Sequence, residues 1–206
     1  DALRRIAKLS GYELRPILPA ADEFHYRRRI RLQVGAGNQL GFYGASSHEL
    51  LKIDACAIAD ETLSHTLETL RRWARPLNTA LEHVEIVIGD EPGEIVVAVR
   101  AAQEFIPRDE PACQNLIGAD GIAGLIVAGN DWRRVLGEPR ITVNLDELVL
   151  RVDADVFTQV NARGNLRILE ELLLAGDFRR DDQVLELFSG AGNFTLPVAR
   201  RVESVS

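Results

Sequence analysis

Apolar and polar residues alternate along residues 24–34, which is the pattern of a β-strand with one buried face. Ile30 and Leu32 lie on the apolar side, and the other side carries Arg27, Arg29 and Arg31. Residues 35–38 contain two glycines and lead into a second short segment, 39–43. The pattern therefore predicts a hairpin with a basic outer face.

The middle of the chain combines one helical pattern with several strand patterns. Apolar residues at helical spacing predict a helix from Asp60 to about Trp73, and Pro76 ends it. Two β-branched runs flank an Asp-Glu-Pro-Gly turn and predict another hairpin, at 84–88 and 95–100. Further strands are expected at 122–127, 133–136, 140–143 and 148–152. Residues 19–154 should thus form an α+β domain of mainly antiparallel hairpins.

The pattern changes near Asp155. A helix at 161–174, a buried strand at 183–187, a glycine turn and a helix at 193–201 are expected in this order. The order is that of the beginning of a Rossmann-like α/β domain, which residues 155–206 would start. Residues 1–18 are expected to form a short helical segment, ending near Gly11, that docks on this domain. Because one complete strand cannot close an α/β sheet, we expect the chain to be a piece of a longer protein.

The composition is that of a globular protein, with 206 residues of which 46% are hydrophobic and 27% are charged. The apolar runs are far shorter than the roughly 20 residues that span a bilayer, and no signal-peptide pattern opens the chain. We therefore expect a cytoplasmic protein that does not contact membranes. The net charge of −7 argues against a protein coated with nucleic acid, so any RNA binding must rely on a local basic cluster.

Residues 184–195 combine a strand that ends near an acidic residue, a glycine turn and a helix start, which together bind ligands through backbone N–H groups. A phosphate-binding P-loop would require Lys and Ser or Thr after Gly192, where the chain has Asn193 and Phe194. A dinucleotide-binding turn would require Gly or Ala at Thr195. S-adenosylmethionine is the ligand that fits best, and a glycine loop without a ligand is the alternative.

The run Leu187-Phe-Ser-Gly-Ala-Gly-Asn-Phe-Thr195 and the upstream run Phe157-Thr-Gln-Val-Asn161 resemble motifs of the RNA (uracil-5-)-methyltransferases, which act on 23S rRNA or on tRNA. Residues 24–32 and 51–58 resemble two further segments of that family in the same order. The resemblance implies a class I methyltransferase that uses S-adenosylmethionine to methylate C5 of a uridine, in 23S rRNA rather than in tRNA. It also makes the arginine strand a candidate RNA-binding surface. A solvated strand face is the alternative interpretation of these arginines.

The resemblance assigns cofactor contacts to a set of residues in the two motifs: Gln159, Glu186, Phe188, Gly190, Gly192 and Asn193. The amide of Gln159 both donates and accepts hydrogen bonds, and the glycines permit close approach of the ligand. Glu186 would orient the loop or the methionine amino group. The structural alternatives are a helix cap for Gln159 and a core aromatic for Phe188.

Cys56 lies where the ribosomal RNA branch of the family has the last cysteine of a four-cysteine iron-sulfur site. The chain supplies one cysteine at this place, so Cys56 is either a former cluster ligand or a buried structural thiol. Cys113 matches no family motif and is expected to be structural.

The resemblance places the nucleophilic cysteine and the general base of the family beyond Ser206. We therefore expect no catalytic residue within these 206 residues and no methyl transfer by this polypeptide alone. Two other functions remain open: a class I methyltransferase of another substrate, and a noncatalytic RNA-binding module.

Overall fold

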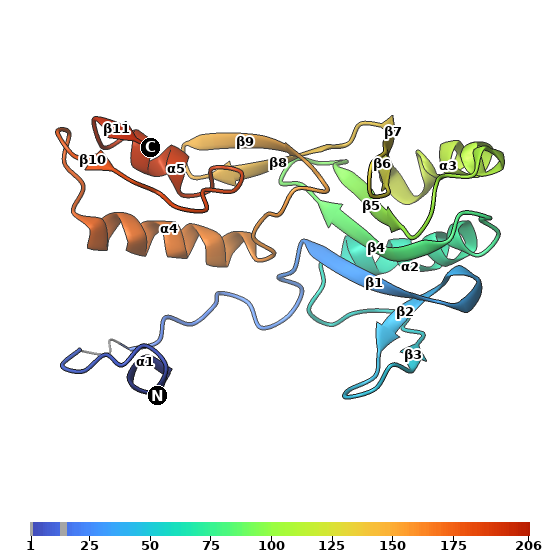
Figure 1. Ribbon diagram of the computed structural model, residues 1–206, viewed down its shortest axis with the longest axis horizontal. Coiled ribbons are helices and arrows are strands. Elements are labelled where there is room, and N and C mark those ends of the chain that lie inside the picture. Colours follow the sequence, from blue (N-terminus) through green and yellow to red (C-terminus); the bar gives the residue numbers. More distant parts are fainter. Residues whose placement is uncertain (1, 13–15) are drawn as a thin grey trace.

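A computed structural model describes residues 2–12 and 16–206. Its centre is a seven-stranded sheet in the order β3-β2-β1-β4-β5-β6-β7 (Figure 1). The strands are β1 (Arg29–Gly35), β2 (Gln39–Tyr43), β3 (Leu50–Leu51), β4 (Leu81–Ile88), β5 (Ile95–Ala101), β6 (Ile122–Ala128) and β7 (Arg133–Gly137). Neighbours are antiparallel except β5 and β6, which are parallel because α3 (Glu110–Leu116) lies in the connection between them.

One face of the sheet is covered by helices. The long helix α2 (Glu61–Ala74) begins at Asp60, whose carboxylate accepts a hydrogen bond from the backbone N–H of Thr62. Its apolar stripe packs in one cluster with the inward residues of the strands and with Cys113 and Leu116 of α3. Burial raises the pKa of the Cys113 thiol to about 11, so Cys113 is a buried, unreactive thiol as expected.

The opposite face of the sheet is divided into two halves. A separate hairpin, β8 (Arg140–Leu145) and β9 (Leu148–Asp153), packs against Val87, Val96 and Ile126 on the first half. The second half is not covered by this hairpin and is lined by polar and basic side chains of β1, β4 and β5. This division leaves a groove on the face of the sheet opposite α2.

The C-terminal part lies beside the β8-β9 hairpin, at the end of the molecule away from α2 and α3 (Figure 1). It contains α4 (Ala162–Gly176), α5 (Thr195–Ala199) and a parallel pair, β10 (Gln183–Val184) and β11 (Ser204–Val205). The prediction of a buried strand at 183–187 is wrong, since β10 has two residues and Leu185 and Leu187 are 72% and 71% exposed. In the described residues, β10 pairs with β11 alone.

Three predicted boundaries also differ from the structure. The strand expected from residue 24 begins at Arg29, because residues 27 and 28 pair with other segments instead. The last helix is limited to α5, and the first to α1 (Ala2–Arg5). The side chains at 4–11 are exposed, and the docking of residues 1–18 stays a prediction. Among the described residues, no helix combines the length and apolarity that crossing a bilayer requires.

Candidate functional site

The segment that carries the Phe-x-Gln-x-Asn motif lies against the beginning of β1. The backbone N–H of Arg28 donates to the carbonyl of Val160 at 2.8 Å, and Arg27 and Asn161 form an antiparallel bridge. Asn161 caps α4, because its side-chain oxygen accepts from the N–H of Gly164 at 2.8 Å. The motif is therefore held between the central sheet and the N-terminus of α4, and Asn161 rather than Gln159 provides the helix cap.

Arg28 fixes this segment through its side chain as well. The side chain is 5% exposed, its Nε donates to the carbonyl of Gln159 at 3.0 Å, and its Nη1 contacts Asp90 Oδ1 at 2.9 Å. The other oxygen of Asp90 accepts from the N–H of Asn144 at 2.7 Å. Arg28 thus joins the motif, the β4-β5 turn and β8. Arg28 was not predicted as a site residue, although an arginine at an apolar position of a predicted strand is a signal of a buried, paired charge.

The glycine loop has an open, strongly curved backbone. Gly190 and Gly192 have φ values of 58° and 91°, and Phe188 has a φ of 62°, a region that side chains other than glycine rarely adopt. Phe188 is fully exposed, so the interpretation as a core aromatic is wrong. Glu186 Oε2 accepts from the Thr195 hydroxyl at 2.5 Å. Thr195, whose presence disfavours a dinucleotide, therefore joins the end of the loop to Glu186 at its beginning.

Asn193 of the loop is tied to α4 by a reciprocal pair of amide hydrogen bonds. Asn165 Nδ2 donates to Asn193 Oδ1 at 2.8 Å, and Asn193 Nδ2 donates back at 2.9 Å. Asn165 is 1% exposed and was not predicted, although an asparagine on the inner face of an amphipathic helix signals a buried polar contact. Contact of Asn193 with a cofactor stays a prediction.

The three predicted RNA-binding arginines differ in their surroundings. Arg29 Nη1 contacts Glu85 at 2.7 Å and its Nη2 donates to the carbonyls of Ala154 and Val156. Its side chain is 11% exposed, and burial lowers its pKa. Arg31 shares Glu85 with it but is 56% exposed, and Arg27 is partly buried. Arg29 therefore acts mainly within the protein, and Arg27 and Arg31 are better placed for a phosphate.

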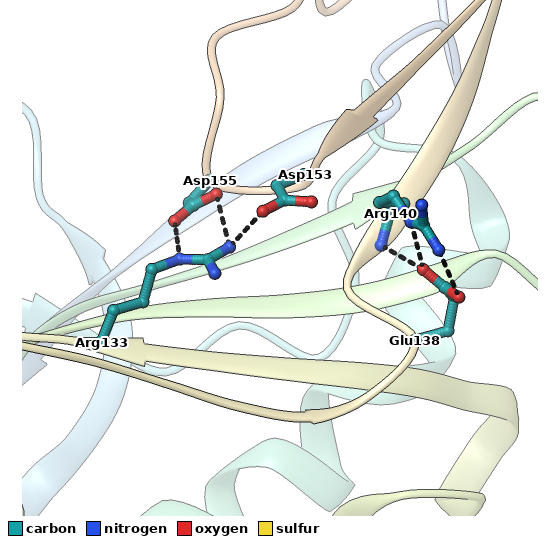
Figure 2. Close-up of polar contacts among 5 residues, drawn as sticks. All are labelled: Arg133, Glu138, Arg140, Asp153 and Asp155. Atoms are coloured by element: carbon teal, nitrogen blue, oxygen red, sulfur yellow. Dashed lines mark hydrogen bonds and ion pairs between the residues drawn. The ribbon is translucent and has the colours of Figure 1, made fainter.

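The three arginines line the groove on the sheet face, which has a volume of about 510 Å³. Asp155 lies at its edge, and Figure 2 shows its carboxylate paired with Arg133, which also contacts Asp153. Arg133 belongs to β7, whereas the two aspartates belong to the end of β9 and the residue run after it. These contacts of Arg133 attach the segment that leads to the Phe-x-Gln-x-Asn motif to the central sheet. In the same view, Arg140 and Glu138 pair where β8 begins.

Cys56 is partly buried and packs against the main core. Among the described residues there is no group of three or more His, Cys, Asp or Glu side chains that is arranged to hold a metal ion. An iron-sulfur cluster requires several thiolates, and the two cysteines are both free thiols. Within the described residues Cys56 is therefore a packing residue of the main core, and its assignment as a former cluster ligand stays a prediction.

Comparisons with known proteins agree with the family resemblance of the two motifs. Residues 123–206 match the sequence model of the tRNA (Uracil-5-)-methyltransferase family. The resemblance predicted from the motifs is thereby confirmed.

The names of individual relatives are more specific than the description of the family. The chain is similar to the 23S rRNA (uracil(1939)-C(5))-methyltransferase RlmD of Shewanella woodyi, with 33% identity covering 95% of the chain and 46% of that protein. The RlmD of Edwardsiella ictaluri is also 33% identical, over 97% of the chain and 47% of that protein. The chain thus spans about half the length of the curated relatives it matches.

A solved structure has the same fold. The Pyrococcus abyssi tRNA (uracil-54, C5)-methyltransferase in complex with S-adenosyl-L-homocysteine superimposes with a TM-score of 0.72, over 96% of this chain and 51% of that chain. The sequence identity is 18%, so this likeness concerns the fold. Together with the family match over residues 123–206, it confirms the predicted class, a mixed α/β and α+β chain that contains the start of a methyltransferase domain.

Proposed function

We propose that the full-length gene product is an S-adenosylmethionine-dependent methyltransferase that methylates C5 of a uridine, in 23S rRNA rather than in tRNA. One observation carries the proposal: two motifs far apart in sequence converge at the N-terminus of α4. Arg28 holds the backbone of Gln159 two residues before the helix cap, and Asn165 in the first turns of α4 holds Asn193 of the glycine loop. A glycine loop without a ligand has no need of this second motif.

The cofactor would be held by the residues that the motifs name. Phe188 offers an exposed aromatic face, and a Cβ added at Gly190 would meet no atom within 4 Å, so the loop leaves open space on that side. Gln159 would contact the cofactor from the α4 side, and Gly192 and Asn193 from the loop side. Glu186 is engaged by Thr195, so we assign it to orienting the loop. When bound, S-adenosylmethionine supplies the methyl group.

RNA would contact the basic face of the sheet, chiefly through Arg27 and Arg31. The names of the relatives support an RNA substrate, and the 23S rRNA enzymes are the more similar ones. Because the net charge of the chain is −7, the chain as a whole does not attract RNA, and RNA binding has to rely on a localised basic surface.

The test is methylation of 23S rRNA and of tRNA transcripts by the full-length gene product and S-adenosylmethionine, followed by nucleoside mass spectrometry. We expect 5-methyluridine in the 23S rRNA. Gln159→Ala should abolish most of the activity, whereas Gln39→Ala, at an exposed position of β2, should not. If tRNA alone is methylated, the substrate is tRNA and not 23S rRNA. RNA binding without any methylated uridine would favour a noncatalytic RNA-binding module.

A further inference from the structure

The groove on the sheet face extends well beyond the arginines of β1. Strand register places His83 of β4 opposite Arg100 of β5, and Glu85 opposite Arg31. Arg31 and Arg100 are thus separated by two strand spacings, about 10 Å across the sheet, with His83 and Glu85 between them. All four side chains line the groove, and its edge is formed by Asp155 and Phe157.

The groove is basic although the chain is acidic. Its two carboxylates are both paired. Glu85 is shared by Arg29 and Arg31, and Asp155 pairs with Arg133 of β7, which also contacts Asp153 (Figure 2). Arg100 is held at the β6-β7 turn, because its Nη1 donates to the carbonyl of Gly129 at 2.7 Å and its Nη2 donates to the side chain of Asn130. Its guanidinium lies 3.8 Å from Glu82, whose side chain is 60% exposed, a weak surface pair. The positive charge of Arg27, Arg31 and Arg100 therefore exceeds the uncompensated negative charge around it.

Between the two arginines, His83 offers a different kind of contact. Burial and the neighbouring Arg31 lower the pKa of His83, which favours the neutral imidazole. A neutral imidazole has one donor and one acceptor nitrogen, which matches a ribose 2′-hydroxyl.

The aromatic ring at the edge of the groove favours single-stranded over double-stranded nucleic acid. Phe157 is 71% exposed, and an exposed ring can stack on an unpaired base but not on a base inside a duplex. Phe157 also precedes Gln159 by two residues, so a strand lying in the groove would run toward the cofactor segment.

We propose that this groove binds a single-stranded RNA segment, with Arg31 and Arg100 contacting phosphates of one strand and His83 contacting a ribose between them. The proposal rests on the proposed function in taking RNA as the partner. It adds two residues, His83 and Arg100, that are distant from both motifs in sequence, and it assigns Arg29 to the protein interior rather than to the RNA.

The experiment measures binding of a fluorescein-labelled oligouridine to this chain by anisotropy, between about 50 and 200 mM KCl. Each phosphate contact contributes about 0.7 to the slope of log K against log salt for a single strand. Arg31→Gln/Arg100→Gln should therefore reduce the slope by about 1.4. The matched control, Arg72→Gln/Arg75→Gln, removes the same charge at exposed positions of α2 and its C-cap, across the sheet, and should keep the slope. Arg31→Lys/Arg100→Lys should also keep it.

A second arm tests the role of His83. The wild-type chain should bind oligouridine several-fold more tightly than oligodeoxyuridine, His83→Ala should remove this preference, and His83→Asn, which retains a donor and an acceptor, should restore part of it. Equal slope losses in the groove and control variants, undetectable binding by the wild type, or equal groove-dependent binding of duplex RNA would each overturn the proposal.

The two proposals fail separately. Binding with the expected slopes but without methylated uridine in any RNA would overturn only the methyl transfer. Methylated uridine together with an unchanged slope would overturn only the groove.

Discussion

The central sheet and the C-terminal part show how differently similar apolar runs behave. In the sheet, β4, β5 and β6 are seven or eight residues long and lie between α2 on one face and the β8-β9 hairpin on the other. In the C-terminal part, β10 and β11 have two residues each, and Leu185 and Leu187 face solvent. An apolar run becomes a buried strand only where neighbouring layers cover it.

The largest expected effect separates the two regions directly. Leu67 of α2 is 1% exposed, and Leu67→Ala should lower the free energy of unfolding by about 2 to 5 kcal/mol because it leaves a cavity. Leu185→Ala should change it by less than about 0.5 kcal/mol, since Leu185 is 72% exposed. Urea denaturation followed by circular dichroism measures both. Similar losses would mean that the two regions are packed alike.

The next effect concerns the junction between the regions. Arg28→Met removes the bonds to Gln159 and Asp90 and should lower the free energy of unfolding by about 2 to 3 kcal/mol. Hydrogen exchange should accelerate at residues 157–161 more than in β5. The control is Arg75→Met at the exposed C-cap of α2, which should alter neither. Uniform acceleration would show that Arg28 supports the whole fold rather than the junction.

A smaller, pH-dependent effect lies in the central region. Burial by itself would raise the pKa of Asp109, but hydrogen bonds from Asn78 and Thr79 outweigh it and lower the pKa. The carboxylate therefore stabilises the fold above the ordinary aspartate value of about 3.9, and this stability is lost as the pH falls through the lower folded value. Asp109→Asn should lower the free energy of unfolding by about 1.5 to 3 kcal/mol at pH 7. The difference from wild type should shrink below about pH 4, and a constant difference would contradict this account.

The smallest effect belongs to the C-terminal part. Asn165→Ala breaks both amide bonds to Asn193 and should lower the free energy of unfolding by about 1 kcal/mol. Exchange at residues 187–196 should accelerate while the central sheet stays protected. A double-mutant cycle with Asn193→Ala should give a coupling of at least about 0.5 kcal/mol. Strict additivity would show that the pair does not hold the loop.

Local patterns predicted most of the central region because local and tertiary preferences agree there. The hairpins, the Asp60 cap and the extent of α2 follow from alternation, turn residues and helical spacing. At residues 183–187 the apolar pattern wrongly predicted a buried strand. In β1 the alternation placed the arginines on one face without separating Arg29 from Arg31. Burial of Arg29 depends on the carbonyls of Ala154 and Val156, which lie more than a hundred positions away in the chain, and periodicity contains no such information.

By itself, the sequence determined the class of fold, the order of the elements and the family resemblance, because each depends on spacing within short segments. Only the tertiary structure decided which polar side chains act inside the protein and which remain available to a ligand. Contacts between distant segments make Arg28 and Asn165 positioning residues. The arrangement of the strands brings Arg100 and His83 into the groove. The physical reason is that burial and pairing of a charge are properties of the assembled layers, whereas a helical or strand period is a property of the local chain.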